Sequence, residues 1–273
     1  MELYYENHMG VKLDFTKSPY LARDISELPN FDKSYSIKNN QLNLETQPAE
    51  LPITINVLAD TKEEYDNACD FLHETMEQDA LLNKQGKIYF NGQYVLCTLV
   101  GSVKKDWCMG VDFQLNYLRF VAVKPFWIKE TEYHFKTASI TSTGNKQYPY
   151  KYPYRYANGM KDSSVINGHI APVHFKLRIY GPCANPFVVI GGHTYRVQTI
   201  LEAGEYLEID SMSETVIKTK VDGTKVNVFH YRSEDCFKKI LPGKQTINWP
   251  GQFDFDLILF EERSEPKWRT NSK

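Results

Sequence analysis

Two aspartates near the C-terminal end have the type and spacing of a catalytic carboxylate pair. Asp254 and Asp256 alternate with Phe253 and Phe255, so both carboxylates project from one face of a predicted strand. At ordinary strand rise they lie about 7 Å apart, a separation that suits two carboxylates acting across a water molecule. The charges continue through residues 261–263, which favours a solvated strand face. A cell-wall hydrolase that uses this pair is kept as a rival hypothesis.

The other familiar signatures of catalysis are missing from the sequence. There is no Gly-x-Ser-x-Gly elbow, no phosphate-binding glycine loop and no H-E-x-x-H motif. The five cysteines are spread singly, without a C-x-x-C pair: Cys69, Cys97, Cys108, Cys183 and Cys236. The histidines of the second half are scattered as well: His169, His174, His193 and His230. We therefore predict free thiols in a reducing compartment, with Cys69 and Cys97 in the core, and no catalytic residue, metal or cofactor.

Five tyrosines alternate with proline and basic residues in one short segment. They are Tyr148, Tyr150, Tyr152, Tyr154 and Tyr156, separated by Pro149, Lys151, Pro153 and Arg155. The two prolines exclude a central strand and favour an edge strand or a polyproline-like strap with one phenolic face. Such a face can stack on sugars or bases, or pack on a neighbouring domain or subunit. Because the chain is mildly acidic, we favour packing, and these tyrosines are the candidates for an inter-domain or subunit interface.

The composition excludes several classes of protein. The chain has 273 residues and a formal net charge of -2, so no global basic field attracts nucleic acid or an anionic membrane. The first residues mix charged and apolar side chains, without a signal-peptide core, and no apolar run is long enough to span a membrane. Aromatic residues make up 14% of the chain, which favours β-sheet over helix bundles. The sequence predicts a folded, mainly β protein made in the cytoplasm.

Turn dipeptides between alternating runs mark three hairpins. Asn91-Gly92 separates residues 87–90 from 93–99, and both turn residues tolerate positive φ. Gly191-Gly192 and Asp222-Gly223 divide similar runs further along the chain. Residues 173–180 and 253–260 show the two-residue period of strands with one face in a core.

One segment has the pattern of an amphipathic helix and lies in the first half. Its apolar residues recur at three- and four-residue spacing: Tyr65, Ala68, Cys69, Leu72 and Met76. Thr61 and Glu64 form a capping box at its start. A polar, apolar-poor stretch follows Phe135, so we predict an N-terminal β-domain with one helix at residues 1–135 and an all-β domain at residues 136–273. No fixed-period repeat is present, which disfavours solenoids and propellers.

A series of short segments occurs in order along nearly the whole chain. They are 52–57 (PITINV), 78–79 (QD), 86–90 (GKIYF), 94–97 (YVLC), 118–120 (LRF), 125–127 (PFW), 180–186 (YGPCANP), 195–197 (YRV), 204–211 (GEYLEIDS), 215–216 (TV), 253–255 (FDF) and 261–268 (EERSEPKW). In this order and spacing the chain resembles the distal tail proteins, or Dit proteins, of long-tailed, non-contractile bacteriophages and prophages.

The resemblance implies a structural hub. It implies an N-terminal β-domain with one helix that forms a six-fold ring around the tail channel, and a C-terminal galectin-like β-sandwich hung on the outside. The expected assembly is a homo-hexamer, as one ring or two stacked rings, that joins the tail tube protein to the tail-associated tip protein and to baseplate or receptor-binding proteins. DNA passes only as cargo, no membrane is involved, and the protein is expected at the virion tail tip after assembly in the host bacterial cytoplasm.

The resemblance carries no catalytic residues and no sugar-binding motif at matching positions. It places the tyrosine segment at the start of the second domain, where an inter-domain role fits both lines of inference. A carbohydrate-binding module that recognises host cell-wall polysaccharide through the tyrosines or the second sandwich stays as the alternative function. We expect no enzymatic activity.

Overall fold

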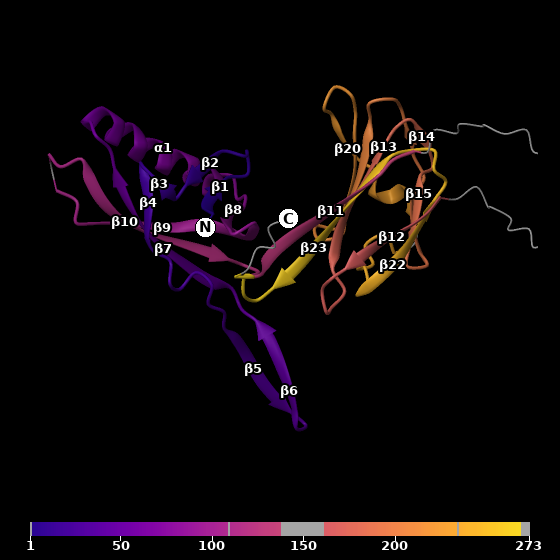
Figure 1. The fold of residues 1–273 in the computed structure, drawn as a ribbon, viewed down its shortest axis with the longest axis horizontal. Coiled ribbons are helices and arrows are strands. Elements are labelled where there is room, and N and C mark those ends of the chain that lie inside the picture. Colours follow the sequence, from indigo (N-terminus) through magenta and orange to yellow (C-terminus); the bar gives the residue numbers. More distant parts are fainter. Residues whose placement is uncertain (1, 109, 138–160, 234, 269–273) are drawn as a thin grey trace, which may run out of the picture. The chain divides into compact units, whose positions relative to one another are not determined.

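The computed structural model describes residues 2–108, 110–137, 161–233 and 235–268, and the chain divides into two compact units. The first unit comprises residues 1–129 together with 262–273, and the second comprises residues 130–261. Nearly all regular structure in the described part is β-strand, with one α-helix (Figure 1). The predicted mainly β class is therefore confirmed. The galectin-like character of the second domain stays a prediction.

The first unit contains one helix and most of the longer strands. Its elements are β1 (Leu3–Glu6), β2 (Lys12–Asp14), β3 (Thr16–Lys17), β4 (Tyr20–Asp24), β5 (Lys33–Lys38), β6 (Gln41–Thr46), β7 (Ala49–Leu58), α1 (Lys62–Leu81), β8 (Gly86–Phe90), β9 (Gln93–Lys105), β10 (Phe113–Ala122) and the start of β11 (Trp127–Phe135).

Strand β9 belongs to two sheets of the first unit. Its first part, Gln93–Cys97, pairs with β8, which in turn pairs with β1 and through it with β2. Its second part, from Thr98 to Lys105, pairs with β10 in the order β9-β10-β7-β4-β3. Along β7 every second residue from Leu51 to Val57 is buried, which is the alternation that a strand with one face in the core requires.

Helix α1 packs into the core of the first unit. Its N-terminus is capped by Thr61, whose side-chain oxygen accepts the backbone N–H of Glu64 at 3.3 Å. The apolar side of the helix buries Tyr65, Leu72 and Met76, among others, so the predicted helix and cap are confirmed. These residues join the strands in one cluster: Leu3, Tyr5, Leu13, Phe15, Ile53, Ile55, Val57, Ile88, Val95, Cys97, Leu118, Phe120 and Trp127.

The C-terminal end of α1 is fixed by a buried carboxylate. Asp79 is fully buried and accepts hydrogen bonds from the Tyr5 hydroxyl, the His8 backbone N–H at 3.0 Å and the His8 ring. Burial, together with the hydrogen bond to Asp79, raises the pKa of the Tyr5 hydroxyl, so it stays protonated and keeps donating. Gly86 passes directly beside this pair. The network ties β1, α1 and β8 together.

Strands β5 and β6 form a separate two-stranded sheet, the arm, comprising residues 33–46 (Figure 1). Its turn is made by Asn39 and Asn40, both at positive φ, a conformation that asparagine tolerates and that suits a tight hairpin. The arm lies in the chain between β4 and β7, which pair with each other in the main sheet. It is an insertion between two neighbouring strands.

In its described residues, the second unit is all β apart from one short 3-10 helix. Its elements are the rest of β11, β12 (Lys161–Asn167), β13 (His174–Tyr180), β14 (Cys183–Ala184), β15 (Phe187–Ile190), β16 (His193–Val197), β17 (Ile200–Leu201), β18 (Tyr206–Asp210), β19 (Thr215–Thr219), β20 (Lys225–Asn227), η1 (Phe229–Tyr231), β21 (Arg232–Ser233), β22 (Gly243–Trp249) and β23 (Phe255–Arg263).

Two sheets of the second unit share one core. One has the order β20-β19-β18-β13-β23 and the other β12-β22-β15-β16-β21. Fully buried side chains from both sheets meet in one cluster: Phe175, Leu177, Ile179, Val188, Tyr195, Leu207, Ile209, Ile247, Trp249, Phe255 and Leu257. The predicted turns at Gly191-Gly192 and Asp222-Gly223 occur here, and that at Asn91-Gly92 joins β8 to β9, so all three hairpins are confirmed.

The compact units differ in two places from the predicted domain ranges of 1–135 and 136–273. The end of β11 belongs with the second unit because Phe135 stacks on Phe255, with ring centroids 4.5 Å apart. The C-terminal segment belongs with the first unit, where Gln93 exchanges two hydrogen bonds with the backbone of Lys267, at 2.9 and 3.1 Å. That the two parts fold as independent domains stays a prediction. The tyrosine segment, Tyr148 to Tyr156, lies outside the described residues.

Candidate assembly site

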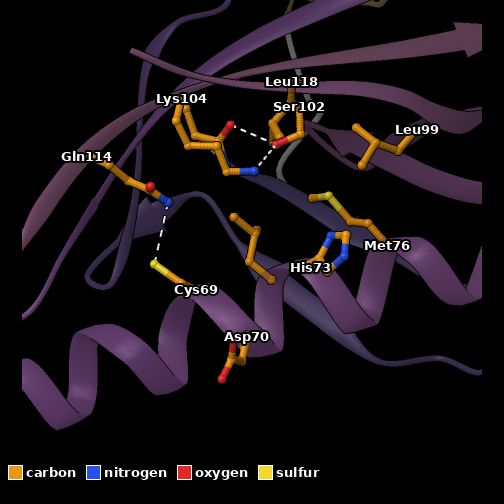
Figure 2. A pocket seen from close by; sticks show the side chains of 11 residues that line it. Cys69, Asp70, His73, Met76, Leu99, Ser102, Lys104, Gln114 and Leu118 are labelled. Carbon is orange, nitrogen blue, oxygen red and sulfur yellow. Dashed lines mark hydrogen bonds between the residues drawn. The ribbon is translucent and has the colours of Figure 1, made fainter. Parts of the chain in front are cut away.

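A cleft opens between α1 and the sheet strands β9 and β10, and we name it the α1 cleft (Figure 2). Its volume is about 230 Å³. It is lined by Cys69, Asp70, Leu72, His73, Met76, Leu99, Ser102, Lys104, Gln114, Asn116 and Leu118. The apolar members come from both walls, and Leu72, Met76 and Leu118 are only 1–3% exposed, so they belong to the core of the unit beneath the cleft.

Five side chains that line the α1 cleft form two hydrogen-bonded groups. Lys104 donates to the Ser102 hydroxyl at 2.9 Å, and Ser102 donates to the Asn116 side-chain oxygen at 2.9 Å. Gln114 lies 3.4 Å from the sulfur of Cys69 and points its amide nitrogen at it (Figure 2). The Gln114–Cys69 contact links the sheet to α1, and the other two bonds lie within the sheet.

The α1 cleft lacks the arrangement of a thiol enzyme. Burial raises the pKa of the Cys69 thiol, which keeps it neutral and a weak nucleophile. His73 also lines the cleft, but its Nε2 lies 3.2 Å from a carboxylate oxygen of Glu77. Cys69 therefore has the surroundings of a structural thiol and not those of an activated nucleophile.

The main sheet of the first unit ends in exposed strand edges. β8 occupies the free side of β9 only along Gln93–Cys97, so no strand among the described residues covers that side from Thr98 to Lys105. Val100 and Val103 on this stretch are about half exposed. At the opposite end the sheet finishes with β4 and the two-residue β3. Exposed edges of this kind invite pairing or covering by another chain.

The two aspartates that suggested a hydrolase hold strands of the second unit together. Asp254 accepts the backbone N–H of Thr137 at 2.5 Å. Asp256 accepts the Tyr180 hydroxyl at 2.6 Å and lies 2.7 Å from Nδ1 of His134. Their oxygens thus bind the end of β11 and the neighbouring β13, which is the geometry of structural carboxylates.

One trio of possible metal ligands occurs in the described ranges, and the sequence analysis missed it. Glu132, His134 and Asp256 bring one ligand atom each to within 4.8 Å of one another. Two of the three side chains are exposed, Glu132 at 47% and His134 at 59%. The hydrogen bond to Asp256 raises the pKa of His134, so the trio has the properties of a surface ion-pair cluster.

The outward face of the second unit's first sheet carries paired charges. Arg178 on β13 donates to Glu208 on β18 at 2.8 and 3.1 Å. Lys176 lies 3.5 Å from Glu208 and 3.3 Å from Asp210. The Arg178 guanidinium also lies over the ring of Tyr206, 5.4 Å from its centroid. The charges on this face therefore pair with one another within the unit.

Cys97 lies in the core, as the sequence analysis predicted, whereas Cys69 is only partly buried and packs against the core. All five cysteines are free, and Cys97 is fully buried, so the predicted free thiols are confirmed. Burial raises the pKa of Cys183 to about 11 and raises that of Cys97 as well. His169 lies within hydrogen-bond distance of the backbone oxygen of Ala171, and His193 of the backbone oxygen of Asp235. Among the described residues, no helix is long and apolar enough to cross a membrane.

Comparisons with known proteins find the same architecture in phage tails. No protein-family model matches the sequence, and no curated protein matches it. The structure is similar to the Dit protein of phage SPP1, a hub of the adsorption apparatus in phages that infect Gram-positive hosts, with a TM-score of 0.54, 10% identity and coverage of 96% of this chain and 100% of that chain.

Two further similar structures come from the phage P2 baseplate in its activated conformation. The chain of the baseplate with Ca has a TM-score of 0.60 and 14% identity, over 97% of this chain and 100% of that chain. The chain of the baseplate with Sr has a TM-score of 0.61 and 14% identity, over 97% of this chain and 99% of that chain. Identities this low show the fold alone. The chain therefore has, over nearly its whole length, the fold of the phage Dit hub proteins.

Proposed function

We propose that this protein is a structural hub of a bacteriophage tail tip or baseplate. The observation that carries the proposal is the likeness to the SPP1 Dit protein and to P2 baseplate chains, which extends over both compact units. Within this function the protein forms a six-fold ring around the tail channel, as one ring or as two stacked rings. Its location is the virion tail, and its role is architectural, without catalysis.

The sheet of the first unit supports a ring. A closed ring repeats one heterologous contact, in which one surface of each copy meets a different surface of the next. The main sheet has one exposed edge at β9 and another at β4 and β3, and each copy therefore brings two different edges to its neighbours. Covering both in a ring removes the exposed edges that make a free monomer prone to aggregation.

The proposed partners follow the position of a hub. One face of the ring binds the tail tube protein, and the other binds the tail-associated tip protein and the baseplate or receptor-binding proteins. DNA passes through the channel as cargo. The tyrosine segment from Tyr148 to Tyr156 is proposed to pack between domains or between subunits, as its alternating phenolic face suggests.

The ring is tested by the mass and shape of the purified protein. We expect light scattering after size exclusion to give six or twelve times the monomer mass of 31.7 kDa, and negative-stain images to show a six-fold ring with a central hole. A strict monomer at every concentration contradicts the ring. Glycan-array binding by such a monomer, lost in a variant with the five tyrosines from Tyr148 to Tyr156 changed to serine, would favour the sugar-binding alternative instead.

A further inference from the structure

A groove with an acidic lining lies at the base of the arm, and we name it the acidic groove. Its volume is about 580 Å³, more than twice that of the α1 cleft. Its lining includes Glu27, Asp32 and Glu50, and none of the described residues that line it is basic. Every lining residue except Ala49 is exposed, so the groove is open to a ligand and does not belong to the core.

The positive charges near the acidic groove offset its lining only in part. Nη1 of Arg119 lies 3.9 Å from the Glu50 carboxylate, and the two side chains are 42% and 60% exposed, so solvent screens this pair. Lys33 lies over the ring of Phe31, with Nζ 5.8 Å from the ring centre. Three acidic side chains around one space repel one another and favour a cation between them. The groove therefore fits a basic ligand.

The loop between β4 and β5 connects the acidic groove to the C-terminal segment. Ser26 and Pro29 of this loop line, together with Trp268, an apolar pocket of about 180 Å³. Glu27 and Asn30 of the same loop line the acidic groove. The loop is tightly turned, because the backbone N–H of Asn30 donates to the backbone oxygen of Glu27 at 3.1 Å. The groove thus begins one residue away from the pocket that holds Trp268.

A short basic segment follows Trp268 in the sequence. Trp268 is the last described residue, and its ring packs edge-on against Phe90. Residues 269–273, which we name the tail, read Arg-Thr-Asn-Ser-Lys and lie outside the described part. The tail has two basic side chains and no acidic one. Five extended residues reach at most about 17 Å, whereas consecutive Cα atoms in the loop are about 3.8 Å apart. The tail is therefore long enough to enter the groove.

We propose that the tail docks in the acidic groove of its own chain, where Arg269 and Lys273 pair with the groove's carboxylates. A guanidinium suits such a site because its planar fork of N–H donors matches a carboxylate. The short connection to Trp268 gives the tail a high effective concentration at the groove, which a basic segment of another molecule lacks. Docking braces the base of the arm from the C-terminal segment. The inference does not depend on the proposed ring.

Zero-length cross-linking of the full-length protein tests the contact directly. A carbodiimide joins an amine to a carboxylate only where the two groups touch. We expect mass spectrometry of the monomer band from a denaturing gel to find Lys273 joined to a carboxylate of the acidic groove. The internal control is Lys62, whose Nζ lies 3.1 Å from the Asp66 carboxylate in an exposed pair, and which should react in the same sample.

The gel bands separate docking in the same chain from the other occupants of the groove. A product of Lys273 with the groove in the monomer band supports the proposal. The same product found only in multimer bands shows that the tail enters the groove of a second copy, and it overturns docking in the same chain. A sample that joins Lys62 to Asp66 but never joins Lys273 to the groove overturns the proposal as well. Ring formation is read separately by negative stain.

The rate at which trypsin cleaves after Arg269 gives an independent measurement. A docked tail is cleaved only when it is released from the groove, so the rate follows the released fraction. Glu27→Gln with Asp32→Asn and Glu50→Gln removes the groove's charges. Because exposed ion pairs are individually weak, we expect this variant to be cleaved about two- to thirtyfold faster than the wild type. Intact mass measures the loss of residues 270–273.

A matched variant shows whether the position of the charges matters. Glu63→Gln with Asp70→Asn and Glu74→Gln removes three charges from exposed positions on α1 and should leave the rate after Arg269 unchanged. Added salt should speed cleavage in the wild type and should have little effect on the groove variant, because salt screens exposed pairs. Circular dichroism checks that both variants are folded. Equal cleavage rates in the wild type and the folded groove variant would overturn the proposal.

Discussion

Two exposed sheet faces of this molecule differ in the side chains that they present to solvent, which are paired charges on one and apolar groups on the other. On the second unit, Lys176 and Arg178 pair with Glu208 and Asp210, so the face is complete in the monomer. On the arm, Tyr35 and its apolar neighbours are exposed, and none of the described residues covers them. The charged face is satisfied by its own ion pairs, whereas the apolar face is the kind of surface that binds a neighbour. We therefore expect the first unit to carry the assembly contact.

The largest effect on stability is expected for a substitution in the core of the second unit. Ring formation should be unaffected by it. Phe255 is fully buried and packs against Phe135 and Trp249, with ring centroids 4.5 and 5.2 Å away. Phe255→Ala should lower the free energy of unfolding by about 3–5 kcal/mol through lost burial and a cavity. Denaturant titration measures the loss. Rings that fail to form at a temperature where this variant is folded would contradict the assignment of assembly to the first unit.

A smaller loss in the free energy of unfolding is expected for a substitution beside the C-terminal end of α1. This substitution should also impair assembly. A Cβ at Gly86 would lie well inside contact distance of the Tyr5 hydroxyl and the Asp79 carboxylate. Both groups are buried, so Gly86→Ala should cost about 1–3 kcal/mol as the network shifts. Denaturant titration and ring counts are measured together. The prediction is wrong if Gly86→Ala lowers the free energy of unfolding but forms as many rings as the wild type under the same conditions.

The charged face should contribute little to stability. The Arg178 and Glu208 side chains are 35% and 24% exposed, so solvent screens their attraction. A double-mutant cycle with Arg178→Met and Glu208→Gln should give a coupling of about 0.2–1 kcal/mol, and each single variant should form rings normally. If either variant loses the ring, the charged face belongs to the assembly and the contrast with the arm disappears.

The smallest effect is a pH dependence centred on His134. The hydrogen bond to Asp256 raises the pKa of this exposed imidazole above its ordinary value near 6.5. Its contribution to stability is therefore fully present below about pH 6.5 and is lost as pH rises through the higher folded-state pKa. Unfolding midpoints against pH should show a small step in the wild type that His134→Asn removes. Glu132→Gln, the weaker neighbour, should keep most of the step.

Local patterns in the sequence predicted the elements that depend on near neighbours. The cap at Thr61, the helix that follows it and the turn at Asn91-Gly92 were predictable because their conformations depend on side chains within a few residues. The arm carries the same kind of signal, since Asn39-Asn40 separates two alternating runs. The sequence analysis missed it, and an asparagine pair flanked by alternating residues could have revealed it.

Long-range partners could not be predicted from local patterns. His134 meets Asp256 across 122 residues, and Asp256 viewed in its own strand looks like half of a catalytic pair. Gln93 hydrogen-bonds to Lys267 across 174 residues, a contact that a boundary drawn from composition after Phe135 does not anticipate. The α1 cleft could not be predicted for the same reason, because its walls come from a helix and two strands that only the fold brings together.

The return of the C-terminal segment to the first unit makes the second unit an insertion in the topological sense. Residues 262–268 complete the first unit, where Trp268 packs edge-on against Phe90 with ring centroids 5.9 Å apart. During synthesis, these contacts form only after the ribosome has translated the whole second unit. A polypeptide that stops before residue 262 lacks them, so the first unit is complete only after the whole second unit has been made.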